Sequence, residues 1–543
     1  MGLSYASGVG EAPLIGETIG ALLQRVASEH PEREALVSRH QGIRLTYAEL
    51  DAQADVLARA LMAAGLEVGD RVGIWSPNCA EWALTQFATA KAGLILVNLN
   101  PAYRATELAY ALEQSGCRLL VSAQSFKTSD YVAMVEEVRG GLPGLERVVF
   151  LDGPDWDALL ALADEVEPDA LRNRSAGLQF DDPINVQYTS GTTGFPKGAT
   201  LSHHNILNNG FFVGELCGYT EEDRVCIPVP LYHCFGMVMG NLGCVTHGAT
   251  MVYPSGGFEP GATLETIQAE RCTSLYGVPT MFIAELGHPE FASFDLSSLR
   301  TGIMAGSPCP VEVMRRVVDE MHMGEVTICY GMTETSPVST QTTAHDELER
   351  RVSTVGRVHP HVEVKIVDPA TNAVVERGQP GELLTRGYSV MLGYWDDAER
   401  TAEAIDGAGW MHTGDLATMD AEGYVNIVGR SKDMVIRGGE NVYPREVEEF
   451  LYTHEAVVDV AVFGVPDDRY GEELCAWIQV KEGHTVTEEE IRAFCRGRIA
   501  HYKVPRYVSV VEAFPMTVTG KVQKYKMREA AVTDLGLKES VTA

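Results

Sequence analysis

Apolar residues along most of this chain follow two alternating patterns, one typical of helices and one typical of buried strands. Residues 45–65, LTYAELDAQADVLARALMAAG, carry apolar positions at helical spacing, and the run stops at Gly65. A strand is predicted next at 70–76, then a helix at 79–93 and another strand at 94–100. This alternation predicts an α/β fold in which helices cover sheets and ligand-facing loops follow the carboxyl ends of strands.

The pattern changes after about residue 356. Short strands separated by glycine and proline turns, such as 362–368 and 381–387, predict a small β-subdomain. A compact α+β segment follows, with helices expected at 444–454 and 487–499 and strands between them. We therefore divide the chain into a large N-terminal domain, residues 1–431, and a small C-terminal α+β domain, residues 432–543.

Length and charge narrow the class of protein. The chain has 543 residues, and a single core rarely grows that large, so two or more domains are expected. Its 43 basic and 75 acidic side chains give a net charge of −32, which argues against a nucleic-acid-binding protein. The eleven cysteines have no paired or zinc-ligand spacing, which favours reduced thiols. With no signal peptide, myristoylation pattern or membrane span predicted, we expect a cytoplasmic protein.

The stretch YTSGTTGFPKG, residues 188–198, follows a run, INVQ, that reads as a buried strand. Its glycines leave backbone N–H groups free to face an anion, Ser190, Thr192 and Thr193 add hydroxyl donors, and Lys197 adds a cation. The spacing differs from that of a Walker A loop. We expect the loop to hold the phosphates of a nucleotide, with a solvent-exposed turn as the alternative.

The loop resembles the phosphate loop of the acyl-adenylate-forming superfamily of AMP-binding enzymes, and further similar motifs follow in the family's order, so that the resemblance covers nearly the whole chain. That superfamily includes acyl-CoA synthetases, luciferase-like enzymes and nonribosomal adenylation domains. The motifs are the phosphate loop (188–198), the adenine-pocket motifs MAGSPCP (304–310) and YGMTE (330–334), the ribose motif WMHTGD (410–415), the hinge GRSKDMVIRGGENVYPREVE (429–448) and the catalytic-lysine motif PMTVTGK (515–521). Segments 98–122 and 228–242 most resemble the medium-chain fatty-acyl-CoA synthetases.

The resemblance implies a reaction in two steps. A carboxylic acid and ATP give acyl-AMP and pyrophosphate, and coenzyme A then converts acyl-AMP to acyl-CoA and AMP. ATP, Mg²⁺ and coenzyme A are the implied cofactors, and the C-terminal domain is expected to be mobile. The residues implied to bind nucleotide or coenzyme are Thr189, Ser190, Gly191, Thr192, Thr193, Gly194, Lys197, Gly306, Ser307, Pro308, Tyr330, Gly331, Met332, Asp415, Arg430, Lys432, Gly438 and Gly439.

Four residues would act near the reacting groups by the same resemblance. Thr333 would bind the α-phosphate, and Glu334 would bind Mg²⁺, a hard ion that prefers oxygen. Lys521 would bridge the substrate carboxylate and the α-phosphate as negative charge gathers between them. His233 would orient the acyl group or gate its channel, whereas an ordinary core histidine is the alternative.

Other roles follow from the motifs in the same way. Tyr330 would offer its ring to adenine, and Asp415 would accept both ribose hydroxyls, with Arg430 sharing the ribose. Lys432 would be the hinge between the two half-reactions, and Gly438 and Gly439 would line the pantetheine tunnel. Read singly, Tyr330 is a core tyrosine and Arg430 a surface arginine. In the same reading, Lys521 is a solvated lysine and Thr333 a helix N-cap.

The predicted acyl pocket lies between the His233 segment and residues 301–307 and includes Phe235, Met237, Met239 and Met304. No cation is evident there for a second carboxylate, which favours an unbranched, medium-chain aliphatic acid. A short, branched or sulfur-containing acid stays open, as do transfer to a carrier protein, a side oxygenase activity and a non-catalytic nucleotide-binding module. The expected partners are small molecules, and a homodimer is left open.

Overall fold

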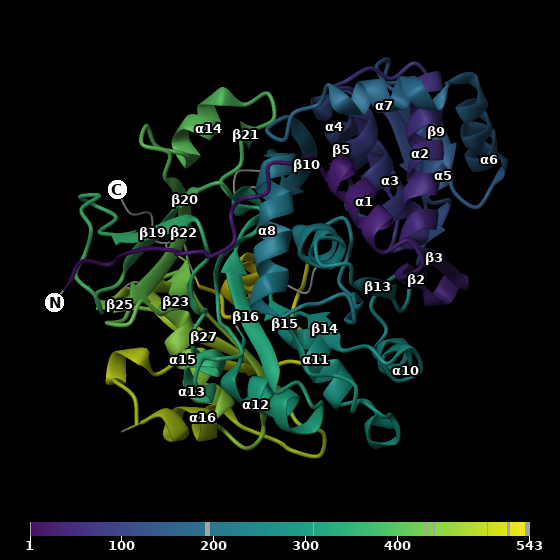
Figure 1. The fold of residues 1–543 in the computed structure, drawn as a ribbon. Coiled ribbons are helices and arrows are strands. Elements are labelled where there is room, and N and C mark those ends of the chain that lie inside the picture. Colours follow the sequence, from purple (N-terminus) through teal and green to yellow (C-terminus); the bar gives the residue numbers. More distant parts are fainter. Residues whose placement is uncertain are drawn as a thin grey trace.

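The computed structural model describes residues 2–189, 196–307, 309–430, 433–437, 440–467, 469–496, 498–517 and 522–537, without the side chains of Arg430, Glu440 and Asn441. Figure 1 shows the helix-covered N-terminal half on the right and the strand-rich segments after residue 356 on the left. The architecture is the α/β arrangement predicted from the sequence.

The first sheet has the strand order β21-β11-β10-β5-β4-β6-β9. Its central strands pair in parallel, while β11 and β21 add an antiparallel edge. The strands are β4 (Arg71–Trp75), β5 (Ile95–Asn98), β6 (Cys117–Ser122), β9 (Arg147–Phe150), β10 (Pro183–Thr189), β11 (Lys197–Ser202) and β21 (Gly393–Tyr394). The inner parallel strands β4, β5 and β6 are largely buried on both faces, as in a sheet covered by helices.

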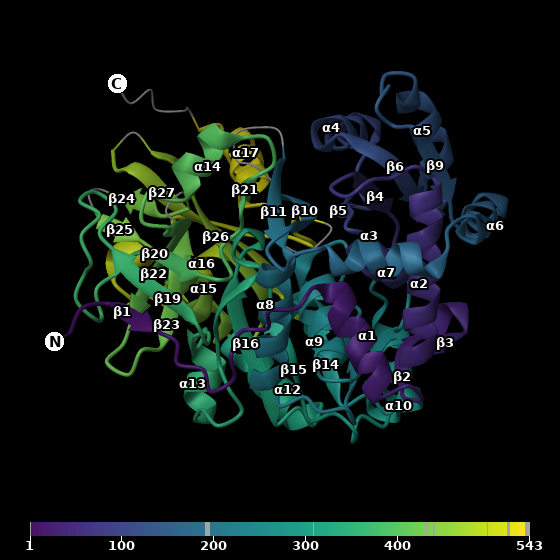
Figure 2. The same ribbon diagram turned by 45° about the horizontal axis from the view of Figure 1, so that its top comes forward.

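Helices of the first 180 residues pack on this sheet and on one another, as Figure 2 shows from a second side. They are α1 (Ile19–Glu29), α2 (Tyr47–Ala63), α3 (Ala80–Ala92), α4 (Ala105–Ser115), α5 (Tyr131–Arg139), α6 (Pro154–Ala161) and α7 (Pro168–Ala176). Helix α2 begins after Thr46, whose hydroxyl accepts a hydrogen bond from the Glu49 N–H, while the Glu49 carboxylate accepts one from the Thr46 N–H. Every residue of α3 except Glu81 is buried, so this helix lies inside the molecule.

A second sheet has the strand order β18-β17-β16-β15-β14-β12-β13-β2-β3 and is parallel from β16 to β2. Its strands are β2 (Glu34–Ser38), β3 (Ile43–Thr46), β12 (Arg224–Cys226), β13 (Thr250–Tyr253), β14 (Ser274–Gly277), β15 (Thr301–Ala305), β16 (Glu325–Gly331), β17 (Val338–Gln341) and β18 (Arg357–Val358). The helices around it are α8 (His203–Leu216), α9 (Gly243–Val245), α10 (Pro260–Glu270), α11 (Pro279–Leu286), α12 (Val311–Glu320) and α13 (Leu348–Ser353), with the π-helix η3 (Phe235–Leu242).

The β-subdomain forms a third sheet, ordered β1-β19-β20-β22-β23. Its strands are β1 (Tyr5–Ser7), β19 (Val362–Val367), β20 (Gly381–Gly387), β22 (Met411–Met419) and β23 (Val425–Arg430), and α14 (Ala398–Ala404) lies beside it. The amino-terminal strand β1 pairs with β19. The first residues of the chain are thereby hydrogen-bonded to the β-subdomain.

The C-terminal segment builds its own sheet, ordered β25-β24-β27-β26 with β28 beside β27. Its elements are β24 (Val435–Arg437), β25 (Glu440–Val442), α15 (Pro444–Tyr452), β26 (Val457–Asp467), β27 (Gly471–Val480), α16 (Glu488–Cys495), β28 (Tyr507–Val510) and α17 (Lys524–Asp534). Consecutive strands β23 and β24 belong to different sheets, which is compatible with the proposed boundary at 431/432. Helix α16 ends at Cys495, four residues earlier than the apolar pattern predicted.

Two further features concern the whole chain. In the described ranges, no helix is both long and apolar enough to cross a membrane. All eleven cysteines are free and buried. Burial raises the pKa of several thiols, including Cys79 and Cys117, each to about 12, so these side chains act as small apolar groups.

Candidate active site

The candidate site lies where strands of the first and second sheets end. Thr189 is the last residue of β10, and Gly331 is the last residue of β16. Ligands in α/β proteins bind beyond the carboxyl ends of such parallel strands. A hydrogen bond from Thr189 Oγ1 to Glu334 Oε1, 3.2 Å long, joins the two strand ends directly.

Glu334 is the buried carboxylate of this site. It lies in the short helix η5 (Thr333–Thr335) and is 5% exposed. Its Oε1 atom accepts a second hydrogen bond, from Tyr394 Oη at 2.9 Å. Burial, and then the negative charge of Glu334, raise the pKa of Tyr394, so its hydroxyl stays protonated and donates. Two neutral donors stabilise the carboxylate without neutralising it.

The turn that presents Thr333 and Glu334 needs a glycine at residue 331. A Cβ atom there would lie 1.7 Å from the carbonyl oxygen of Pro337, so no side chain fits. The next residue, Met332, donates its N–H to the same carbonyl at 2.9 Å. Thr333 is the first residue of η5 and Met332 is its N-cap, so the alternative that Thr333 is an N-cap is wrong.

Tyr330 and Asp415 meet at a second point of the site. Tyr330 Oη donates to Asp415 Oδ2 over 2.6 Å, joining β16 to β22. The Asp415 backbone N–H donates to Thr413 Oγ1 at 3.1 Å, in the middle of β22. Arg430 pairs with Asp415 in the β22–β23 ladder. The structure thus brings the predicted adenine and ribose residues side by side, and their roles stay predictions.

The remaining predicted nucleotide residues surround these contacts. Gly306 follows β15 with a φ of +89°, a conformation that favours glycine, and Ser307 comes after it. Lys197 opens β11, and its Nζ lies 4.8 Å from the centroid of the Tyr394 ring. Other predicted residues lie outside the described residues: Ser190, Gly191, Thr192, Thr193, Gly194, Pro308, Lys432, Gly438, Gly439 and Lys521.

His233 lies two residues before the π-helix η3. Its carbonyl accepts hydrogen bonds from the N–H groups of Gly236 and Met237, 3.0 and 3.1 Å long. The side chain is half-buried, and its Nδ1 accepts a longer bond from Phe235 N at 3.4 Å. π-Helices are rare and occur frequently at functional sites, which favours the functional role predicted for this histidine.

Buried amide side chains of the first sheet form hydrogen bonds with the segment that contains His233. Asn98 Nδ2 donates to the Tyr232 carbonyl at 2.9 Å, and Asn185 Nδ2 donates to Asn98 Oδ1 at 2.9 Å. Gln187 Nε2 continues the chain by donating to Asn185 Oδ1, and Gln187 Oε1 accepts from Cys234 Sγ. This buried amide ladder, which the sequence did not predict, fixes the residues on both sides of His233.

The predicted acyl pocket needs one correction. Phe235, Met237 and Met239 pack in one apolar cluster, and β15 contributes Ile303 to it. Met304 belongs to a different cluster on the other side of the sheet, so its predicted place in the pocket is wrong. The reason is the alternation of side chains along a strand, which sends neighbouring residues to opposite faces.

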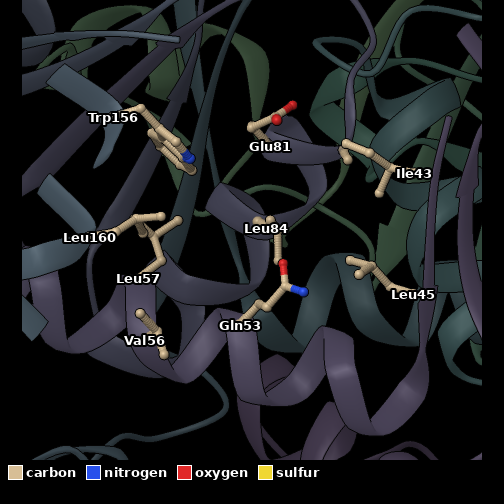
Figure 3. Close-up of a pocket in the computed structure, with 10 residues that line it drawn as sticks. Ile43, Leu45, Gln53, Val56, Leu57, Glu81, Leu84, Trp156 and Leu160 are labelled. Carbon is tan, nitrogen blue, oxygen red and sulfur yellow. The ribbon is translucent and has the colours of Figure 1, made fainter. Parts of the chain in front are cut away.

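Figure 3 shows a different pocket, remote from the predicted residues in sequence and fold, with a volume of about 170 Å³. Trp156 and Leu160 of α6 lie on one side of it, and Ile43 and Leu45 of β3 on the other. Its lining is mostly apolar and includes the Glu81 carboxylate, which would repel the head group of a carboxylic acid. This pocket is therefore not the predicted acyl site.

The site suits a Mg²⁺ ion bound together with a nucleotide. In the described part of the chain, no group of three or more His, Cys, Asp or Glu side chains is arranged to hold a metal. Mg²⁺ usually binds through one or two carboxylates plus substrate phosphates rather than in an all-protein cage. Glu334, a buried carboxylate bonded by Thr189 at the end of β10, would be that carboxylate.

The fold and these motifs define an AMP-binding enzyme, and the chain belongs to that family. The AMP-binding enzyme family matches residues 23–395, and the AMP-binding enzyme C-terminal domain matches residues 446–521. The resemblance predicted from the motifs is therefore confirmed.

Two relatives cover nearly the whole chain. "Putative acyl-CoA synthetase YngI" of Bacillus subtilis (strain 168) is 49% identical over 97% of this chain and 100% of its own length. "Medium-chain acyl-CoA ligase ACSF2, mitochondrial" of Danio rerio is 48% identical over 98% of this chain and 91% of its own length. Among solved structures, the anthranilate CoA ligase AuaEII in complex with anthranoyl-AMP has a TM-score of 0.86 at 28% identity, covering 97% of this chain and 99% of its own.

Proposed function

We propose that the protein is an AMP-forming acid–CoA ligase that activates aliphatic, medium-chain carboxylic acids. The observation that carries the proposal is a pair of contacts: Thr189, at the end of β10, bonds Glu334, just beyond β16, and Tyr330 of β16 bonds Asp415 of β22. These residues come from separate motifs of the AMP-binding family and form one site. ATP and coenzyme A are the substrates that the family and its relatives imply.

The first half-reaction joins the acid to AMP. An oxygen of the substrate carboxylate attacks the α-phosphorus of ATP, the bond to the β-phosphate oxygen breaks, and pyrophosphate leaves. The chain needs no covalent nucleophile for this step, so its residues act by positioning and charge stabilisation. In the proposal, Thr333 binds the α-phosphate, Asp415 binds the ribose, and Lys521 neutralises charge on the reacting oxygens.

Glu334 is proposed to hold Mg²⁺ together with the phosphates. A bound Mg²⁺ would neutralise phosphate charge and orient the leaving pyrophosphate. The buried carboxylate and its two hydroxyl donors are what this chain contributes.

The second half-reaction forms the thioester. The thiolate of coenzyme A attacks the acyl carbonyl of the adenylate, and AMP leaves with the electrons of the broken bond. In the proposal, the C-terminal domain turns at Lys432 between the steps, and Gly438 and Gly439 then leave space for the pantetheine arm.

The choice of a medium-chain acid rests on the apolar cluster around η3 and on the relatives named medium-chain ligases. Each buried CH₂ group contributes about 0.8 kcal/mol, so activity should rise with chain length until the pocket is filled. A homodimer and a cytoplasmic location belong to the same proposal. The Danio rerio relative is named a mitochondrial protein, so cell fractionation has to test the location.

A pyrophosphate-release assay tests the function directly. The protein is incubated with ATP, Mg²⁺ and unbranched acids of increasing length, with and without coenzyme A. We expect acid-dependent pyrophosphate with a medium-chain optimum, and multiple turnovers only when coenzyme A is present. Pyrophosphate without any thioester would favour transfer to a carrier protein. No pyrophosphate with any acid would overturn the proposal.

A further inference from the structure

Tyr394 is held in place on several sides beside the phosphate loop. Its strand β21 pairs with β11, where Ala199 faces Tyr394 and Thr200 faces Gly393. Its backbone N–H donates to Thr401 Oγ1 at 2.9 Å, and the next residue, Trp395, donates its N–H to the Gly198 carbonyl at 2.7 Å. The tyrosine ring is therefore fixed to the strand that immediately follows the loop.

The same segment binds Glu334 through both its side chain and its backbone. Tyr394 Oη donates to Oε1 of Glu334 at 2.9 Å, while the backbone N–H of Met391 donates to the Glu334 carbonyl at 2.9 Å. Thr189 Oγ1 donates to the same Oε1 atom. Among the described residues, none donates a hydrogen bond to Oε2. Because both donors engage Oε1, the second carboxylate oxygen remains available to a ligand.

We propose that Tyr394 is a positioning residue that sets the orientation of the Glu334 carboxylate for binding the metal–nucleotide complex. This inference rests on the proposed function and adds a residue outside the motifs that predicted it. By engaging Oε1, the hydroxyl restricts rotation of the carboxylate, while Oε2 accepts no hydrogen bond from the described residues. A group that orients a metal-binding carboxylate in this way is commonly required for full metal affinity.

The position of Lys197 supports this role. Its ammonium group lies over the Tyr394 ring, 4.8 Å from the centroid, and in the described part of the chain it makes no ion pair with Glu334. A cation paired directly with Glu334 would compete with a metal ion for the carboxylate. The ring instead holds the lysine next to the carboxylate, while the hydroxyl of the same side chain stabilises the negative charge.

Substitution Tyr394→Phe tests the inference because it keeps the ring and removes only the hydroxyl. The measurement is the affinity for Mn²⁺, followed by electron paramagnetic resonance, of the full-length protein loaded with a non-hydrolysable ATP analogue. We expect Mn²⁺ to bind about tenfold more weakly to the variant than to the wild type. Affinity for the analogue without metal should not change, since the ring and Lys197 remain.

Tyr388→Phe is the matched control, because it removes a hydroxyl from the same segment. Tyr388 Oη accepts a hydrogen bond from Asn209 and does not touch Glu334. This control should bind Mn²⁺ like the wild type. The unfolding temperatures of both variants show whether removal of the hydroxyl disturbs packing rather than the orientation of the Glu334 carboxylate.

Three outcomes would overturn the inference. Wild-type Mn²⁺ affinity in Tyr394→Phe would show that the hydroxyl does not orient the carboxylate. An equal loss of metal-free nucleotide affinity, with a lower unfolding temperature than Tyr388→Phe, would assign Tyr394 to packing. If the wild type itself bound no Mn²⁺–nucleotide complex, the proposed function would fail together with the inference.

Discussion

Tyr330 and Asp415 define a contact whose energy can be measured residue by residue. The tyrosine hydroxyl engages one oxygen of the carboxylate over 2.6 Å and so restricts its rotation. Because a hydrogen bond to a charged group contributes roughly 1.5–3 kcal/mol, we expect Tyr330→Phe to raise the KM for ATP about tenfold. The value of kcat should change little, because the ribose is bound equally before and during the reaction.

Tyr424 provides a matched control for this substitution. Its hydroxyl donates to Asp346 Oδ1, also over 2.6 Å, in a contact that includes none of the predicted site residues. Tyr424→Phe should therefore leave the KM for ATP at the wild-type value. An unchanged KM in Tyr330→Phe, measured by initial rates at saturating acid and coenzyme A, would contradict the ribose role of Asp415.

Single residues differ in how far the sequence could predict them. Glu334 and Asp415 stand in motifs whose residue types already point to their chemistry, and the structure brings both to the site. Tyr394 follows a short apolar stretch and reads as a core residue, since its contact with Glu334 joins positions 60 residues apart. Met304 was misplaced because an apolar run buried on both faces does not reveal which residues face which side.

At the scale of elements, the segment between β23 and β24 is the proposed joint of the molecule. Strand β23 ends at Arg430 in one sheet and β24 starts at Val435 in another. Proline fixes φ, so Lys432→Pro should block the rotation between the half-reactions. We expect adenylate formation at the wild-type rate and little thioester, as measured by separate single-turnover assays. Equal loss of both half-reactions would contradict a hinge at this position.

Most individual elements were predictable because their apolar period is clear. Helices α2, α3 and α15 and strands β4 and β5 lie within the predicted ranges. The π-helix η3 was not predicted, since residues 228–242 are apolar on all sides and carry no periodic signal. Hydrogen bonds from the buried amide ladder hold the residues that precede η3. These bonds join positions far apart in the sequence, so a local pattern of apolar residues cannot predict them.

At the scale of the whole molecule, the site depends on how separate sheets meet. The sequence predicted βα layers and a later β-subdomain, and both are present. It did not predict that β21, from the region after residue 356, pairs with β11 of the first sheet and carries Tyr394 to Glu334. Such pairings join distant parts of the chain, and only the folded structure reveals them.

The central claim is that this assembled site activates carboxylic acids by charge stabilisation between the acid and ATP. ATP–pyrophosphate exchange in the absence of coenzyme A isolates that step, and Lys521→Met removes the proposed charge. A control reaction of the variant with acyl-AMP and coenzyme A shows whether the protein is folded. We predict acid-dependent exchange by the wild type. In the variant, the rate of exchange should fall at least about a hundredfold. Undiminished exchange by Lys521→Met, or none by the wild type with any acid, would contradict the account.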